Sequence, residues 1–462
     1  MFSKTWRSLV LVIGETLLLV AAVVISSALI AGSYAFEMLS DNTAMLRVLL
    51  IVLVCQLCLH YSDLYDLRTI TTKGDFFRRL LRALGATSLI LGIAYWLFPL
   101  LVVEQGVFLL AVVIALGLVM AWRTAFGWLI DHLAPRERLL LVGTSPAAIV
   151  LARELFERRN ELGVDIVGFV DPDPSRVGAP IINPGVVGVI GDIPALTARL
   201  RVDRVVVSLS DARGKLPMDH LLDVRMRSGV LFDHLATVYE DYTGKIALEN
   251  LRPSWLVFSS GFRKTWLLLA TKRAFDIVAA IFGLILSLPL TLLTALIVKL
   301  ESPADPVFYH QERIGLNGAS FTIHKFRTMR SDAEAASGPV WSAANDSRIT
   351  SVGAFLRKTR LDEIPQLWNV LRGDMSLIGP RPERPAFVAQ LTEQIPYYGQ
   401  RHVVKPGLTG WAQVRYSYGA SVEDALEKMQ YDLYYVKHMS MAFDLMIALE
   451  TIKIVVLRRG GR

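Results

Sequence analysis

The chain is poor in cysteine. Its 462 residues include only two, Cys55 and Cys58, and both lie in one apolar run. Two thiols cannot complete a four-ligand zinc site, and they supply no disulfide framework. Their CxxC spacing also occurs in metal and redox motifs, but we interpret both as small buried apolar residues. The shortage of cysteine fits soluble parts that lie in the cytosol.

Several signature motifs are also missing. Gly143 follows an apolar run but precedes Thr-Ser-Pro, so the GxGxxG loop of dinucleotide enzymes is absent. No Tyr-x3-Lys pair of the short-chain reductase type occurs. No recognised nucleic-acid-binding motif is evident, so we expect no nucleic-acid partner. The N-terminus lacks a cleavage-site pattern, which predicts a retained first helix.

Long apolar segments are abundant, since 53% of the residues are hydrophobic. Four segments, near 8–31, 45–61, 83–103 and 107–130, are each about long enough to cross a ~30 Å hydrocarbon core. The connection over 33–44 has no Lys or Arg, whereas the one over 67–82 is basic and Arg136 and Arg138 follow the fourth segment. This alternation predicts a four-helix transmembrane bundle over 1–135, with the next domain in the cytoplasm. Glu15, in the first segment, is either a functional carboxylate or a helix-packed acid.

Residues 137–258 have the pattern of a Rossmann-like α/β domain. The runs RLLLVG, VDIVGFVD and DRVVVSLS predict strands, and Ser145 with Pro146 predicts a helix start between the first two. Alternating strands and helices predict a small parallel sheet. Asp171 has about the spacing expected of a ribose-binding acid. Nucleotide binding and a regulatory or oligomerisation role both stay open.

A fifth apolar segment lies within 271–299. Pro289 removes a backbone donor, which predicts a bend, and Ser287 can bond a nearby carbonyl. Lys272 and Arg273 precede the segment and Lys299 follows it. Basic residues on both flanks favour a re-entrant helix with both ends on one face of the membrane. The alternative is a kinked spanning helix, which would place everything after Leu300 outside the cell.

We predict that residues 300–462 form a mixed α/β domain and that this domain contains the catalytic residues. Lys325 and Arg327 are two residues apart in a predicted strand, so they share a face and suit a diphosphate; the alternative is a solvated basic strand. Lys405 to Trp411 is a basic turn that fits either a headgroup interface or a structural turn.

Adjacent carboxylates and a constrained arginine mark the centre of this domain. Asp362 and Glu363 follow Arg357 and Arg360, and we expect these arginines to lower a carboxylate pKa and keep it ionised, as a nucleophile requires. Arg381 lies between two prolines, which fix the backbone and aim a guanidinium that can bind phosphate. Taken alone, the carboxylates also fit the opening of a helix before Pro365.

The region 271–457 closely resembles the bacterial sugar transferase family, the monotopic phosphoglycosyltransferases. The runs KFRTM, LRKTRLDEIPQLWNVLRGDMSLIGPRP and KPGLTGWAQV match its signatures. With four N-terminal spans and an α/β module, the whole chain is similar to large members that begin exopolysaccharide or O-antigen assembly. One departure is visible, because the family's helix break often reads Ser-Pro, whereas Leu288 separates Ser287 from Pro289 here.

The resemblance implies an enzyme of the bacterial inner membrane with its catalytic domain in the cytoplasm. Asp362 would attack the β-phosphate of a UDP-sugar and release UMP, and undecaprenyl phosphate would then accept the phosphosugar. Glu363 would bind Mg²⁺ or handle a proton. Arg381 would hold a phosphate, with Arg357, Lys325 and Arg401 as further candidates. We also expect a homodimer. Two alternatives are a non-enzymatic scaffold of a polysaccharide assembly complex and a nucleotide-sugar oxidoreductase or dehydratase centred on 137–258.

Overall fold

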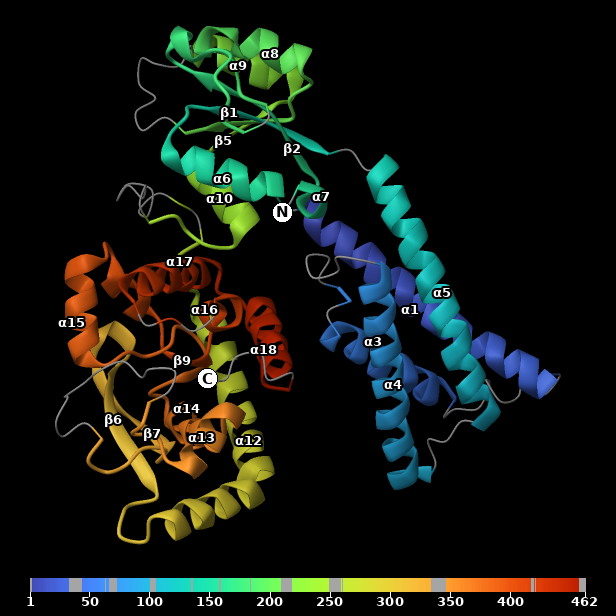
Figure 1. Ribbon diagram of the computed structural model, residues 1–462, viewed down its shortest axis with the longest axis vertical. Coiled ribbons are helices and arrows are strands. Elements are labelled where there is room, and N and C mark those ends of the chain that lie inside the picture. Colours follow the sequence, from blue (N-terminus) through green and yellow to red (C-terminus); the bar gives the residue numbers. More distant parts are fainter. Residues whose placement is uncertain are drawn as a thin grey trace. The chain divides into compact units, whose positions relative to one another are not determined.

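The computed structural model describes most of the chain. The described residues are 2–32, 44–62, 64–65, 73–99, 105–133, 136–157, 159–182, 184–208, 218–248, 259, 261–333, 346–416, 419 and 421–456. The chain divides into two compact units, 1–238 and 239–462 (Figure 1). Most of the connection over 33–44 and part of the basic one over 67–82 lie outside the described residues.

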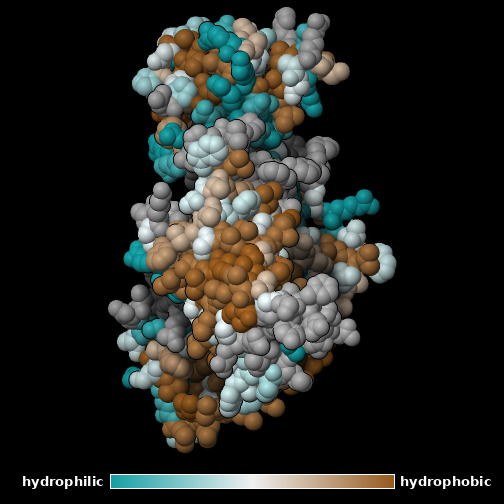
Figure 2. Space-filling model, turned by 90° about the vertical axis from the view of Figure 1, so that its right-hand side faces the viewer, coloured by the Kyte–Doolittle hydropathy of each residue, from teal (hydrophilic) through white to brown (hydrophobic). Residues whose placement is uncertain are grey.

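Four long helices open the first unit: α1 Phe2–Ala31, α3 Ala44–Tyr61, α4 Lys73–Leu97 and α5 Gln105–Leu133. Segments of α1, α4 and α5 are long and apolar enough to cross a membrane, whereas Met45–Tyr61 is shorter. Figure 2 shows a wide hydrophobic face where these helices turn toward the viewer. Helix α4 begins well before the predicted residue 83, because Asp75 in its first turn bonds Arg79 one turn later at 2.8 Å.

The described interior of this helical part is mainly apolar; it also holds one ion pair and the hydroxyls of Ser26, Ser27 and Thr87, which donate to carbonyls of their own helices. Cys55 and Cys58 are buried and unpaired with each other, which confirms their interpretation as small buried residues. Glu15 is fully buried and forms an ion pair with Arg123 of α5, which also donates to the carbonyl of Leu64. Glu15 is therefore a helix-packed acid that joins the middle of α1 to the second half of α5.

The α/β part of the first unit is built on five parallel strands. They are β1 Glu137–Val142, β2 Val164–Asp171, β3 Val186–Val189, β4 Arg204–Val207 and β5 Leu231–His234, in the order β3-β2-β1-β4-β5. Helix α6 (Pro146–Glu157) lies on one face of the sheet, and α8 (Ile193–Arg199) and α9 (Met218–Ser228) lie on the other (Figure 1). Ser145 accepts a hydrogen bond from the Ala148 amide at 3.2 Å, as expected of an N-cap. The predicted parallel sheet is confirmed.

The second unit begins at Tyr239, within α10 (Leu235–Thr243), and so includes residues assigned to the α/β domain by the predicted range 137–258. Ile246 and Leu248 are buried in a core cluster with Phe387 and Leu433. Burial of these apolar side chains favours packing of this segment with the second unit. The remaining elements are α12 Trp266–Glu301, β6 Phe308–Ile314, β7 Ser320–Phe326, α13 Ser351–Thr359, α14 Gln366–Arg372, β8 Ser376–Ile378, α15 Pro385–Gln394, β9 Gly407–Thr409, α16 Trp411–Arg415, α17 Val422–His438 and α18 Met441–Val456.

Helix α12 runs as one helix from Trp266 to Glu301 but is not straight. It contains Pro289, and Figure 1 shows it changing direction in its second half. Ala280 packs in one cluster with Ile323, and Val298 packs in another with Phe326. A straight helix would separate Ala280 from Val298 by about 27 Å, whereas Ile323 and Phe326 are only about 10 Å apart on strand β7. The predicted bend is therefore present. The Ser287 hydroxyl lies 3.5 Å from the Leu284 carbonyl.

Candidate active site

The two adjacent carboxylates lie in a tight turn between two helices. Helix α13 ends where Arg360 takes a left-handed backbone conformation, with φ of 60°. A single 3₁₀ turn, Leu361–Glu363, then precedes Pro365 and α14. Asp362 and Glu363 are 7% and 9% exposed, although both are acidic. Buried acids need compensation, and the surrounding cations provide it.

Glu363 is held by three cations from different parts of the chain. Its Oε1 accepts hydrogen bonds from Nη2 of Arg381 at 2.5 Å and from Nζ of Lys325 at 3.0 Å, and Nη1 of Arg360 lies 3.8 Å away. Burial acts to raise the pKa of Glu363, but Arg381 and then Lys325 outweigh it and hold that pKa well below its ordinary value. Glu363 is thus ionised.

Asp362 differs from its neighbour. Its Oδ1 is buried and has no hydrogen-bond partner among the described residues. Burial first, and then the charge of Glu363, raise the pKa of Asp362 to about 6, against the lowering effect of Lys325, Arg357 and Arg360. Arg357 and Arg360 do act to lower this pKa, as expected, but burial and the Glu363 charge outweigh them at Asp362. Asp362 is still mostly ionised at pH 7.

Lys325 and Arg327 do not meet at the carboxylates. Lys325 lies on β7 and contacts Glu363. The strand ends at Phe326, so Arg327 is beyond it; Arg327 is buried and lies 3.6 Å from Asp305. The prediction that Lys325 and Arg327 share one face of a strand is therefore wrong, because Arg327 lies outside the strand. Arg357 donates from Nε to the Thr328 hydroxyl at 2.9 Å and contributes to the field at Asp362.

The loop that carries Arg381 is fixed by close backbone packing. Gly379 directly follows strand β8. A Cβ on Gly379 would lie 2.4 Å from the carbonyl oxygen of Lys405. The Gly407 amide donates to the Pro380 carbonyl at 2.9 Å. The prediction of a rigidly aimed arginine agrees with this packing, and the arginine is aimed at Glu363.

Arg401 is buried and surrounded by protein partners. Its Nη2 donates to the Arg381 carbonyl at 2.9 Å and lies 2.7 Å from Oδ2 of Asp432, and its Nη1 donates to the Tyr398 hydroxyl at 2.6 Å. Sequence reasoning missed Asp432 and Tyr398. A signal was present, since Asp432 interrupts the apolar face of a helix formed by Met429, Leu433 and Val436.

Trp411 is a structural residue. It is buried, and its Nε1 donates to the Gly244 carbonyl at 2.8 Å. The headgroup-interface alternative for the Lys405–Trp411 turn is therefore wrong for this side chain. Gly407–Thr409 instead forms strand β9, which pairs in parallel with β8.

The metal-binding capacity of the site rests on two carboxylates. Among the described residues, no group of three or more His, Cys, Asp and Glu side chains is arranged to hold a metal ion. The unpartnered oxygen of Asp362 fits a ligand position. Magnesium usually binds through one or two carboxylates and completes its shell with substrate phosphates and water, so the residues present fit Mg²⁺ better than a protein-caged metal.

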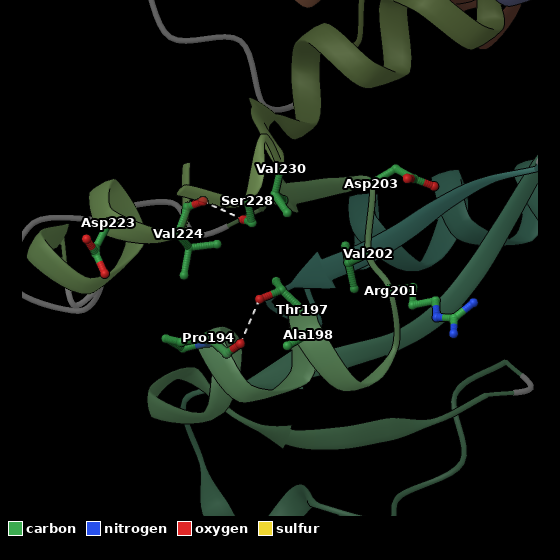
Figure 3. Close-up of a pocket in the computed structure, with 10 residues that line it drawn as sticks. All are labelled: Pro194, Thr197, Ala198, Arg201, Val202, Asp203, Asp223, Val224, Ser228 and Val230. Atoms are coloured by element: carbon green, nitrogen blue, oxygen red, sulfur yellow. Dashed lines mark hydrogen bonds between the residues drawn. The ribbon is translucent and has the colours of Figure 1, made fainter. Parts of the chain in front are cut away.

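The α/β part has an acid at the carboxyl end of β2 and a pocket elsewhere. At the carboxyl end of β2, the Asp171 carboxylate accepts from the Thr144 hydroxyl and from Arg176 at 3.2 Å, so the acid at the ribose position already has protein partners. A cavity of about 420 Å³ lies at the other end of the strands, between α8 and α9 (Figure 3). Its Thr197 and Ser228 hydroxyls bond carbonyls of their own helices.

Comparison with known proteins matches two family models. Residues 267–458 match the model described as bacterial sugar transferase, and residues 60–215 match one described as CoA-binding domain. The first match includes the whole cluster of Lys325, Asp362, Glu363 and Arg381.

Individual relatives are similar over different parts of the chain. An Aeromonas hydrophila UDP-N-acetylgalactosamine-undecaprenyl-phosphate N-acetylgalactosaminephosphotransferase is 38% identical over 59% of this chain and 63% of its own length. An Escherichia coli UDP-glucose:undecaprenyl-phosphate glucose-1-phosphate transferase is 34% identical over 71% of this chain and 70% of its own. A Rhizobium leguminosarum exopolysaccharide production protein, PSS, is 42% identical, and 98% of its length matches only 42% of this chain.

The alignment with the Aeromonas protein thus spans less than two thirds of that relative, whereas the one with the Escherichia coli protein spans more than two thirds of it. The Rhizobium match shows that a relative exists whose length is accounted for by about two fifths of this chain. By its match to the family model and to the Escherichia coli relative, of which it covers more than two thirds, this chain belongs to the bacterial sugar transferase family.

Proposed function

We propose that the protein transfers a sugar 1-phosphate from a UDP-sugar to undecaprenyl phosphate, a first step in building an exopolysaccharide, O-antigen or capsule. Relatives named for this type of transfer support the proposal. The observation that carries it is the buried dyad, in which Asp362 keeps an unpartnered oxygen while Glu363 is held by Arg381 and Lys325. An ionised, desolvated carboxylate next to fixed cations is suited to attack on a phosphate ester.

The proposed reaction has two displacements. A carboxylate oxygen of Asp362 forms a bond to the β-phosphorus of the UDP-sugar, and the bond from that phosphorus to the bridging oxygen breaks, so UMP leaves. The phosphate oxygen of undecaprenyl phosphate then attacks the same phosphorus and releases the Asp362 carboxylate. The product is undecaprenyl diphosphate sugar. Covalent catalysis of this kind divides a three-body encounter into two steps.

The cations around the dyad have a clear task in this scheme. Arg381 offers a planar guanidinium that binds phosphate, and Lys325 adds a point charge beside it. Both contact Glu363 in the structure, so Glu363 orients them for the donor diphosphate. The carboxylates of Glu363 and Asp362 would hold Mg²⁺ together with donor phosphates, and the bound metal would supply positive charge for the leaving phosphate.

The bend in α12 supports a re-entrant arrangement. Lys272, near the start of α12, donates to the Ile378 carbonyl at 2.9 Å, and Glu301, at its end, accepts from the Val352 amide at 3.0 Å. Both ends are therefore fixed on the same domain. Between them, Phe282, Ile285 and Leu286 are mostly exposed, which suits contact with lipid. A helix that enters and leaves on one face keeps this domain on the cytoplasmic side of the bacterial inner membrane, where UDP-sugars and the lipid phosphate meet.

The test is UMP release by the purified full-length chain in lipid nanodiscs, with Mg²⁺ and a panel of UDP-sugars that includes UDP-glucose and UDP-N-acetylgalactosamine. We expect release with at least one donor, and a phosphosugar adduct on Asp362 in intact mass spectra when the lipid acceptor is omitted. Asp362→Asn should abolish both. Asp332→Asn is the matched control, because Asp332 is exposed.

The alternatives predict different results. A scaffold would release no UMP with any donor, and Asp362→Asn would leave its behaviour unchanged. An oxidoreductase centred on 137–258 would bind NAD, for which the occupied Asp171 carboxylate offers no support. UMP release without any adduct on Asp362 would remove the covalent step while keeping the transfer.

A further inference from the structure

We propose that Asp432 and Arg401 are positioning residues that set the location of Arg381, and hence of the donor diphosphate. The inference rests on the proposed function. It is carried by one continuous path of contacts, in which Asp432 holds Arg401, Arg401 holds the Arg381 carbonyl, and the Arg381 side chain holds Glu363.

Arg401 is built into the protein interior, where it acts on the backbone of the Arg381 loop. It is 6% exposed, and its two terminal nitrogens contact Asp432, Tyr398 and the Arg381 carbonyl. Nη2 already contacts two protein oxygens, the Arg381 carbonyl and Oδ2 of Asp432. Its two hydrogens are therefore not available to a phosphate. This arrangement assigns Arg401 to holding the loop rather than to binding phosphate directly.

Asp432 supplies the charge that makes this burial possible. It is 1% exposed, and it lies on α17 beside the fully buried Leu433. A guanidinium buried without a counter-charge would be strongly unfavourable, so the ion pair keeps Arg401 in place. Tyr398, 2% exposed, fixes the other branch of the guanidinium.

Helix α17 provides a rigid base for the pair. Its start is fixed by a capping box, in which Ser421 accepts from the Asp424 amide and Asp424 accepts from the Ser421 amide. Its side chains Met429 and Leu433 pack in a core cluster with Tyr398. Because Asp432 is on a helix fixed in this way, the Arg381 carbonyl is tied to the core of the unit rather than to another loop.

The consequence for catalysis is geometric. The prolines on either side of Arg381 restrict the loop, but they do not determine where it lies relative to β7 and the dyad. The hydrogen bond from Arg401 adds a contact from the buried core to the backbone contacts that already hold Gly379 and Pro380 against residues 405–407. A displacement of about 1 Å at a positioning group can lower a rate by about a hundredfold. Loss of Asp432 should therefore reduce donor use although Asp432 never touches the donor.

The experiment compares Asp432→Asn, Arg381→Lys and the double variant in nanodiscs, by UMP release and by UDP binding in calorimetry. We expect Asp432→Asn to lower kcat/KM by about tenfold to a hundredfold and to weaken UDP binding. In the Arg381→Lys background it should cause no further loss beyond about twofold, because both changes act on the same contact.

The matched control is Glu427→Gln, on the same helix as Asp432, which breaks an ion pair of 2.7 Å between Glu427 and Lys245. This variant should keep kcat/KM within about twofold of the original. If Asp432→Asn fails to fold, Tyr398→Phe removes only the hydroxyl that fixes Arg401 and should show a smaller loss in the same two measurements.

Two results would overturn the positioning role: an Asp432→Asn protein with unchanged kcat/KM, or losses that multiply in the double variant. Failure of the proposed function is distinguishable, because the unmodified chain would then release no UMP from any UDP-sugar.

Discussion

Glu363 accepts a hydrogen bond from Nη2 of Arg381 at 2.5 Å, across 18 residues of the chain. This contact separates the roles of two neighbouring acids. It holds Glu363 ionised, while burial and the Glu363 charge raise the pKa of Asp362. Two carboxylates whose pKa values are pushed apart by their surroundings usually have different chemical tasks.

The first prediction concerns the acid limb of the pH profile. Asp362 must be ionised to attack, and its pKa is about 6. The ionised form therefore dominates above pH 6 and is lost below it, so kcat/KM for the UDP-sugar should fall about tenfold per pH unit below this value. UMP release measured from pH 4.5 to 8 tests this. A profile flat down to pH 4.5 would contradict it.

The second prediction is that two substitutions move the acid limb of the pH profile in opposite directions. Lys325 lowers the pKa of Asp362 and Glu363 raises it. Lys325→Met should therefore move the acid limb of kcat/KM to higher pH, and Glu363→Gln should move it to lower pH, each with reduced activity. Lys358→Met is the control, because Lys358 is exposed on α13 and is not among the charges that shift the pKa of Asp362. It should leave the midpoint of the acid limb unchanged. Shifts of the same sign for both variants would refute this assignment of charges.

The third prediction concerns the packing of the Arg381 loop. A Cβ at Gly379 would lie 2.4 Å from the Lys405 carbonyl oxygen, which is backbone and cannot turn aside. Gly379→Ala should separate β8 from β9, displace Arg381 and lower kcat/KM by about tenfold or more. Gly399→Ala is the control, because a Cβ there meets open space. Equal activities of the two variants would contradict the expected displacement.

The fourth prediction places both ends of α12 on one side of the membrane. In a background where Cys55 and Cys58 are replaced by Ala, single cysteines introduced as Arg263→Cys and Ala304→Cys flank the helix at exposed positions. We expect an impermeant maleimide to label both in inside-out vesicles and neither in spheroplasts. Labelling of the two positions from opposite sides would show a spanning helix instead.

The fifth prediction concerns stability. Trp411→Phe removes the indole donor to the partly buried Gly244 carbonyl. The lost hydrogen bond should lower the free energy of unfolding by about 0.5–1.5 kcal/mol. Trp368→Phe is the matched control, since Trp368 is 54% exposed and should change stability by less than about 0.5 kcal/mol. Chemical denaturation followed by circular dichroism measures both, and equal effects would refute a structural role for the buried indole.

Local patterns in the sequence were sufficient for much of the fold. The parallel sheet follows from apolar runs separated by helical segments, and the start of α6 follows from Ser145 and Pro146. The bend of α12 follows from Pro289. The early start of α4 was missed, because its charged first turn has the composition of a loop although Asp75 and Arg79 pair along a helix.

The order of residues along the chain is sufficient to identify the centre of the site, because Asp362, Glu363 and Arg381 stand in runs typical of one family. Which acid binds the cations depends on the folded chain, where Glu363 has a lowered pKa and Asp362 a raised one. The fold also pairs Arg401 with Asp432 and places Arg327 beside Asp305. Local propensity acts over a few residues, whereas ion pairing, desolvation and backbone contact join segments far apart in the chain, so no local pattern specifies them.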